Sequence, residues 1–201
     1  MKFIVIEGLD GSGKSTAARL LAERIKLNGA PCHITKEPTK SQIGMLIRSV
    51  LAGDDPNFYS ALPFLFAADR LLHIKGELLP ALESCNVVCD RYYYSNMAYQ
   101  SSTPESLERA VSLNQPAMNL CRPDITFFIN VSPAECMRRI EARGERVSIF
   151  ESLPKLEYLH DRYIAVFARM ESTDSIVFVG SDTATPEDVV VEMLQHISYL
   201  D

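Results

Sequence analysis

The chain has 201 residues, a length typical of one domain rather than two. Apolar residues make up 47% and charged residues 23%, which provides material for a sizeable core and excludes wholesale disorder. The formal net charge of -6 argues against a protein that binds nucleic acid polymers or anionic membranes, because such proteins carry an excess of basic residues. A small anionic ligand held by a few cations remains compatible with this charge.

The cysteines and the N-terminal segment indicate the cellular compartment of the protein. Five cysteines without a C-x-x-C pair predict reduced, mostly buried thiols: Cys32, Cys85, Cys89, Cys121 and Cys136. The first residues, MKFIVIEGLD, contain too short an apolar run for a signal peptide, and no run approaches the ~20 apolar residues of a membrane span. We therefore expect a cytoplasmic protein without a membrane partner.

Short apolar runs alternate with longer helical stretches along the chain. Strands are expected over Lys2–Glu7, Pro31–Lys36, Asn86–Asp90, Asp124–Val131 and Ser175–Gly180. Helices are expected over Gln42–Leu51, Ser60–Leu82, Glu105–Leu120 and Phe150–Met170. The runs FIVI, NVVC and ITFFI are continuously apolar, as in parallel strands buried on both faces. This pattern predicts a single α/β domain over residues 1–201, a doubly wound five-stranded parallel sheet flanked by helices, with ligands at the carboxyl ends of the strands.

Two further helix starts share one pattern. Ser132-Pro133-Ala134-Glu135 and Thr185-Pro186-Glu187-Asp188 each offer a capping hydroxyl, a proline at the first helical position and an acid at the third. These segments predict helices that begin after the fourth and fifth strands.

Directly after the first strand comes GLDGSGKS, a G-x-x-x-x-G-K-[ST] phosphate-binding motif between a strand and a helix. Its glycines let backbone N–H groups turn inward around phosphate oxygens, and the following helix presents its positive end. Lys14 is expected to reach the β- and γ-phosphates of a nucleotide and Ser15 to ligate Mg²⁺. The alternative, a plain glycine turn, is much weaker for a complete motif in this context. The expected nucleotide-binding residues are Gly8, Gly11, Ser12, Gly13, Lys14, Ser15, Thr16 and, from a later loop, Arg143.

The third strand ends in Asp90, where a Walker-B-type carboxylate would hold magnesium directly or through water. An ordinary turn aspartate is the alternative. Beside a phosphate loop, a Mg²⁺ site of Ser15 and Asp90 is favoured.

Arginines follow several predicted strands: Arg48, Arg91, Arg143 and Arg146. Taken singly, each is explained by a surface ion pair. As a set they favour phosphoryl transfer, because guanidinium groups bind phosphates in bidentate fashion. The chain has no N-K-x-D, which argues against a GTP-hydrolysing switch.

The phosphate loop, the Lys36-Glu37-Pro38 segment and the F-x-x-x-R from Phe66 to Arg70 are similar to motifs of one enzyme family, and with them the chain resembles the thymidylate kinases. The segment DRYYYSNMAYQ, Asp90 to Gln100, resembles the family's D-R-Y-x-x-S-x-x-A-Y, and RPDITFFINVSP resembles the strand before the lid. The resemblance covers most of the chain. It implies a homodimeric enzyme that uses ATP and Mg²⁺ to phosphorylate dTMP to dTDP.

The resemblance also implies a base site. Phe66 would stack on the thymine ring, and Arg70 would hydrogen-bond its O4 edge and so select a carbonyl over the amino group of cytosine. Ser95 and Asn96 would line the pocket, with Gln100 adjoining it. From the residues alone, Phe66 belongs to an apolar run, and a core position is its alternative.

For the sugar and the acceptor phosphate, the resemblance implies four further contacts. Tyr99 would crowd the 2′ position, and Asp10 would approach the 3′-hydroxyl or the metal shell. Arg48 and Arg91 would hold the phosphate. The full set expected at the substrate is Asp10, Glu37, Pro38, Arg48, Phe66, Arg70, Arg91, Ser95, Asn96, Tyr99 and Gln100.

Position 11 is glycine where some family members have arginine, so the transition-state cation is expected from a short lid near residues 143–152. Arg143 and Arg146 are its candidates, and Arg146 is preferred. The expected catalytic residues are Lys14, Arg91, Arg146 and Asp10. No general base is assigned, because a phosphate monoester with a second pKa of ~6 is largely ionised at neutral pH.

Several alternatives stay open at this point. Another pyrimidine nucleotide kinase would share these motifs, and a deoxynucleoside kinase would use a carboxylate such as Glu37 as its base. A GTP switch and a non-catalytic nucleotide-binding module are weaker alternatives, the latter because Lys14, Ser15 and Asp90 are intact.

Overall fold

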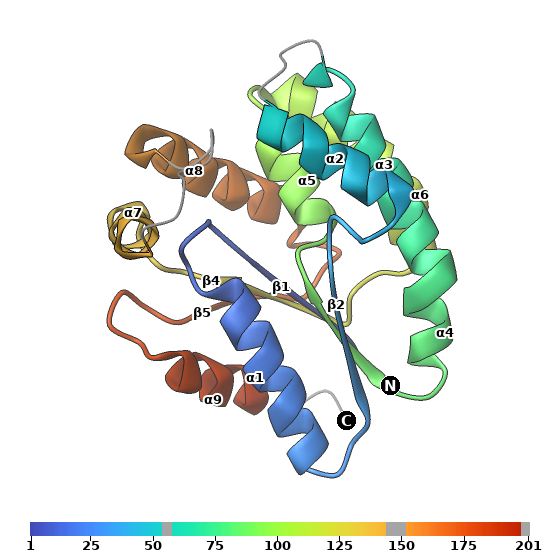
Figure 1. Ribbon diagram of the computed structural model, residues 1–201, viewed down its shortest axis with the longest axis vertical. Helices are drawn as coiled ribbons and strands as arrows, with labels where there is room; N and C mark the ends of the chain where they lie inside the picture. Colours follow the sequence, from blue (N-terminus) through green and yellow to red (C-terminus); the bar gives the residue numbers. More distant parts are fainter. Residues whose placement is uncertain (54–57, 144–151, 198–201) are drawn as a thin grey trace.

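The protein is described by a computed structural model that covers residues 1–53, 58–143 and 152–197. One sheet contains β1 (Phe3–Gly8), β2 (Cys32–Lys36), β3 (Asn86–Asp90), β4 (Ile125–Ile129) and β5 (Ile176–Val179). All its neighbouring strands are parallel, in the order β2-β3-β1-β4-β5 (Figure 1). The predicted five-stranded parallel sheet is confirmed, with strand ends that differ from the expected ones by at most two residues.

Burial follows the position of each strand in the sheet. The central strands β1 and β4 are buried along their whole lengths, whereas the edge strands β2 and β5 are partly exposed. The continuously apolar runs in β1 and β4 therefore reflect helices that cover both faces of the sheet.

The helices divide into two groups around the sheet. They are α1 (Lys14–Leu27), α2 (Gln42–Gly53), α3 (Leu62–His73), the π-helical segment η2 (Ile74–Leu78), α4 (Leu79–Leu82), α5 (Tyr93–Gln100), α6 (Pro104–Leu120), α7 (Pro133–Ala142), α8 (Leu153–Met170) and α9 (Pro186–Ile197). Helices α1 and α9 pack against each other on one side of the sheet, and α3, α5, α6 and α8 lie on the other (Figure 1).

Both predicted helix starts are confirmed. The Ser132 hydroxyl accepts a hydrogen bond from the N–H of Glu135 at 3.2 Å, and the Thr185 hydroxyl accepts one from the N–H of Asp188 at 3.2 Å. These caps satisfy N–H groups that have no partner within the helix, so α7 and α9 begin where the sequence indicates.

The helical stretch expected over Ser60–Leu82 is confirmed from Leu62 to Leu82, but it is not a single α-helix. Helix α3 ends at His73, and η2 separates it from α4. Pro80 has no N–H to donate to the carbonyl of Gly76, and this loss accompanies the wider helical turn. Helix α8 begins at Leu153, and residues 150–151 of the helix expected there lie outside the described residues.

All five cysteines lie in the described residues and are free thiols, four of them buried and Cys85 half-buried, as expected. Burial raises the pKa of Cys32, Cys121 and Cys136 to about 11. Across the described ranges, no helix combines the length and apolar character needed to cross a bilayer.

Candidate active site

The phosphate loop joins β1 to α1 and depends on the absence of a side chain at Gly11. Gly11 has φ +86°, and a Cβ placed there would lie 2.4 Å from the carbonyl oxygen of Cys136 in α7. Both observations require glycine. The structure thus gives a physical reason why this chain lacks an arginine at position 11.

Lys14, the first residue of α1, is buried against the loop. Its Nζ donates to the carbonyl oxygen of Leu9 at 2.6 Å and lies 3.7 Å from Oδ1 of Asp10. Burial lowers the pKa of Lys14, and the nearby charge of Arg91 acts in the same direction. The ammonium group is therefore held at the loop that is expected to bind phosphate.

Ser15 and Asp90 form the pair expected to hold magnesium. The Ser15 hydroxyl donates to Oδ2 of Asp90 at 2.5 Å, while Oδ1 of Asp90 is buried without a hydrogen-bond partner among the described residues. A buried, unpartnered carboxylate oxygen beside a hydroxyl fits the oxygen ligands that Mg²⁺ requires. The described residues contain no cluster of three or more His, Cys, Asp or Glu side chains that could hold a metal. Phosphate and water oxygens would therefore complete the coordination.

Arg91 follows β3 and occupies a strained backbone conformation. Its φ is +72°, the only positive φ of a non-glycine residue in the described part of the chain. Nη2 donates to Oδ1 of Asp10 at 2.5 Å, and Nη1 donates to the hydroxyls of Ser95 at 3.0 Å and Tyr163 at 3.2 Å. Such strain costs about 1–3 kcal/mol and is concentrated at functional sites. These contacts fix the guanidinium between the phosphate loop and α5.

Asp10 is charged in this arrangement. Burial alone would raise its pKa, but the positive charges of Arg91 and Lys14 outweigh that effect and hold the pKa well below its ordinary value. The Tyr99 hydroxyl also donates to Oδ2 of Asp10 at 3.1 Å. Asp10 is thus an ionised acceptor that two cations and a phenol share.

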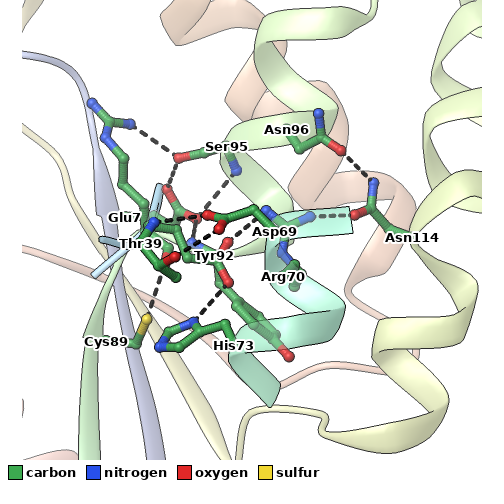
Figure 2. A network of polar contacts seen from close by, with 12 residues as sticks. Glu7, Thr39, Asp69, Arg70, His73, Cys89, Tyr92, Ser95, Asn96 and Asn114 are labelled. Atoms are coloured by element: carbon green, nitrogen blue, oxygen red, sulfur yellow. Dashed lines mark hydrogen bonds and ion pairs between the residues drawn. The ribbon is translucent and has the colours of Figure 1, made fainter. Parts of the chain in front are cut away.

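Glu7, next to the last residue of β1, binds the two hydroxyls that Arg91 also contacts, and it was missed by sequence reasoning. Its Oε1 accepts from the N–H groups of Tyr92 at 2.8 Å and Ser95 at 3.1 Å (Figure 2). Its Oε2 accepts from the hydroxyls of Ser95 at 2.6 Å and Tyr163 at 3.0 Å. Burial raises the pKa of Glu7, although the Arg91 charge opposes this shift. A carboxylate inside a buried apolar strand was a usable signal for Glu7, whereas nothing local indicates Tyr163.

A cavity of about 220 Å³ lies beside α5 and gathers eight of the residues expected at the substrate. Its lining is Asp10, Pro38, Leu51, Phe66, Arg91, Ser95, Asn96, Tyr99 and Gln100. Phe66 is half-buried, because it packs against a small apolar cluster around Ile47 and also lines the cavity. Leu51 was not expected there. We refer to this space as the base cavity.

Arg70 and Glu37 do not line the base cavity. Arg70 is 1% exposed, and its Nη2 forms an ion pair with Oε2 of Glu37 at 2.7 Å. Its Nη1 donates to Oδ1 of Asn114 at 2.5 Å, and the guanidinium lies over the Tyr92 ring at 5.3 Å. Figure 2 shows Arg70 within this buried group of polar side chains. His73 lies 3.1 Å from the other oxygen of Glu37.

Arg48 also lies apart from the base cavity. Its guanidinium donates to the backbone carbonyls of Pro38, of Thr39 at 2.5 Å and of Gly44 at 3.3 Å. It lines a separate cavity of about 350 Å³ together with Ser15 and Asp90, and Pro38 lines both spaces. The two arginines expected at the acceptor phosphate therefore line different cavities.

Asp69 on α3 holds the segment after β2 in place and was also missed. Its carboxylate accepts from the N–H of Thr39 at 2.7 Å and from the Thr39 hydroxyl at 2.6 Å (Figure 2). It also accepts from the Ser41 hydroxyl at 2.6 Å. The carbonyl groups that hold Arg48 thus belong to a segment that α3 fixes.

Arg143 is exposed and lines two cavities, of about 310 Å³ each, next to the phosphate loop. One contains Lys14, Asp90 and Arg91, and the other extends to Pro186 at the start of α9. Arg139 was not expected in this second cavity. Arg146 and residues 144–151 of the expected lid lie outside the described residues.

Comparison with known proteins agrees with this geometry. A family model described as thymidylate kinase matches residues 6–191. A probable thymidylate kinase of Pyrococcus abyssi is 38% identical over 201 residues, covering 96% of each chain. Two further probable thymidylate kinases are similar: one of Pyrococcus horikoshii, 40% identical over 87% of this chain and 88% of its own, and one of Methanococcus aeolicus, 38% identical over 98% and 95%. The predicted resemblance is confirmed, and the chain belongs to the thymidylate kinase family of nucleoside monophosphate kinases.

Proposed function

We propose that the protein transfers the γ-phosphoryl group of ATP to dTMP, giving ADP and dTDP, with Mg²⁺ as cofactor. One observation carries this proposal beyond family membership. Asp10 and Arg91 line both the base cavity and the cavity at Lys14 and Asp90. An acceptor phosphate bound beside Asp10 and Arg91 would lie next to the terminal phosphate of a nucleotide in the phosphate loop, as an in-line transfer requires.

The residues around the loop supply positive charge and orientation. Lys14 and Arg91 would stabilise the charge that spreads over the transferring group. Ser15 and Asp90 would hold Mg²⁺, which neutralises phosphate charge when bound. Arg143 lines both loop cavities and supports a role for the lid, and Arg146 remains our preferred transition-state cation. The reaction needs no covalent enzyme intermediate and no general base, because the acceptor phosphate is already ionised.

The base cavity would hold the thymidine moiety. Phe66 would stack on the base, an interaction of about 1–3 kcal/mol. Asn96, Ser95 and Gln100 would surround its edges, and Tyr99, held against Asp10, would exclude a 2′-hydroxyl. Arg70 and Glu37 would act from the buried layer next to this cavity, and Arg48 from the segment after β2.

We also propose a homodimer. Large apolar side chains are exposed along α2 and α3, with Met45 at 57%, Phe64 at 64% and Leu72 at 55%. A second copy of the chain would remove this apolar surface from water. Sedimentation velocity tests the assignment: we expect a dimer for the wild-type protein and a shift toward monomer for Phe64→Lys, and a monomeric wild type would contradict it.

The substrate assignment is tested with purified protein, ATP, Mg²⁺ and a panel of dTMP, dUMP, dCMP, dGMP, UMP, CMP and thymidine. We expect dTMP to have the highest kcat/KM and thymidine to be inert. Efficient use of thymidine would support a deoxynucleoside kinase. Preference for CMP or UMP with dTMP inert would overturn the substrate assignment.

A further inference from the structure

Asn114 on α6 joins Asn96, which lines the base cavity, to the buried side chain of Arg70. Its Oδ1 accepts from Nη1 of Arg70 on α3 at 2.5 Å, and its Nδ2 donates to Oδ1 of Asn96 on α5 at 2.9 Å. Figure 2 shows these contacts as one continuous chain, Arg70 to Asn114 to Asn96. All three residues are buried, and Asn114 itself is 1% exposed.

The direction of every hydrogen bond in this chain follows from Arg70. A guanidinium has donors and no acceptor, so the Asn114 atom that faces it must be the amide oxygen. The Asn114 nitrogen then points to the opposite side, where it donates to the carbonyl of Ala110 at 2.8 Å as well as to Asn96. The two contacts fix the same amide orientation independently.

This orientation fixes the next amide in turn. Because Asn114 offers Asn96 a donor, Asn96 must present its oxygen to Asn114 and keep its Nδ2 for another partner. Nδ2 of Asn96 is buried and has no hydrogen-bond partner among the described residues. Nε of Arg70 is likewise buried and without a hydrogen-bond partner there. Buried donors without partners are unfavourable and are expected to be matched when a ligand binds.

We infer that Asn114 is a positioning residue that sets base selectivity by holding Asn96 and Arg70 as hydrogen-bond donors beside the base cavity. This inference rests on the proposed function. The N–H groups of Asn96 and Arg70 favour a pyrimidine whose edge carries a carbonyl oxygen. They disfavour a pyrimidine whose edge carries an amino group, since an N–H of the protein that faces an N–H of the base leaves both without an acceptor. Asn114 is not part of the lining of the base cavity and acts through its two neighbours.

The test uses Asn114→Asp in the full-length protein. Aspartate still accepts from Arg70 but cannot donate to Asn96, so the Asn96 amide becomes free to turn and present its oxygen. We expect the ratio of kcat/KM for dTMP over dCMP to fall roughly five- to tenfold, as for the loss of one matched hydrogen bond. The KM for ATP is expected to stay at its wild-type value.

Two further variants keep the test decisive. Asn96→Asp keeps an acceptor for Asn114 but removes the free donor, so it is expected to lower the same ratio even if Asn114→Asp fails to fold. Gln115→Glu makes the same amide-to-acid change one residue later, on an exposed side chain that bonds Asn119, and is expected to leave the ratio unchanged.

The outcomes separate the two proposals. A wild-type enzyme that prefers dTMP, with an unchanged or uniformly reduced kcat/KM for both nucleotides in Asn114→Asp, would overturn this inference and show that Asn114 is only structural. A wild-type enzyme that ignores dTMP would overturn the proposed function instead.

Discussion

At the phosphate loop one contiguous segment, residues 8–16, supplies most of the expected binding groups. The base cavity takes most of its lining from α2, α3, α5 and the segment after β2, and it shares Asp10 and Arg91 with the loop. The loop works through backbone conformation, and Gly11 is required by its φ and by the nearby carbonyl of Cys136. The base side works through buried side chains whose partners are distant in sequence, such as Arg70 and Asn114. Anion binding is thus a local property of the chain, and base recognition is a property of its tertiary packing.

The two sides also differ in how charge is used. Around the loop, Lys14, Arg91 and Asp10 interact closely enough to shift one another's pKa values. Next to the base cavity, the charge of Arg70 is already matched by Glu37, and neutral amides make the remaining contacts. Substitutions on the two sides should therefore have separable effects. Substitutions of Arg70 and Lys14 test this separation, and substitutions of Gly11 and Asp10 test the packing and the charge of the loop.

Arg70→Ala is expected to have the largest effect. It leaves Glu37 buried without its ion-pair partner, and breaking a buried pair costs about 3–5 kcal/mol of stability. We expect chemical denaturation to show this loss and dTMP kinetics to deteriorate much more than ATP binding. Arg19→Ala, which removes an exposed ion pair with Glu23, is the control and is expected to change little. Equal loss of dTMP and ATP binding would assign Arg70 a purely structural role.

Lys14→Ala is expected to lower kcat about 10²–10³-fold with every acceptor nucleotide, because a charge that stabilises the transferring phosphate is removed. The relative preference among acceptors should not change. Steady-state kinetics with dTMP and dUMP measure both quantities, and Lys26→Ala near the exposed end of α1 is the matched control. A change in acceptor preference would contradict the separation of the two sides.

Gly11→Ala is expected to destabilise the protein by about 1–3 kcal/mol, since alanine is strained at φ +86° and its Cβ would meet the carbonyl of Cys136. Urea denaturation measures the loss. Gly76→Ala is the control, because a Cβ there meets no other atom within 4 Å. Equal stability of the Gly11→Ala and wild-type proteins would contradict the close approach of α7 to the loop.

The pH dependence of Asp10 is the smallest expected effect. Its pKa is lowered in the folded protein, so the folded state binds fewer protons than the unfolded state at acidic pH. The resulting stability is fully present above an ordinary aspartate pKa of about 4 and is lost as the pH falls below it. The stability difference between wild type and Asp10→Asn should therefore be constant from pH 7 to pH 5 and shrink toward pH 3.5. A constant difference down to pH 3.5 would show that Arg91 and Lys14 do not hold Asp10 in its charged form.

How much the sequence could predict follows the same division. Apolar runs and the glycine motif are local signals, so they predicted the five strands, the loop and the positions of Lys14 and Ser15. The family resemblance added Phe66 and Asn96, which do line the base cavity. Glu7 stands out as a carboxylate in an apolar strand, but the local sequence does not identify the partners of Glu7, Asn114 or Tyr163. Those contacts arise only when α5, α6 and α8 pack together.

The most direct test of the separation is a calorimetric titration of ATP and dTMP into Lys14→Ala and Phe66→Ala. We expect Lys14→Ala to bind dTMP as the wild type does and to lose ATP affinity. Phe66→Ala should bind ATP normally and bind dTMP about 1–3 kcal/mol more weakly. Loss of affinity for both ATP and dTMP in either variant would contradict the separation of the phosphate loop from the base cavity.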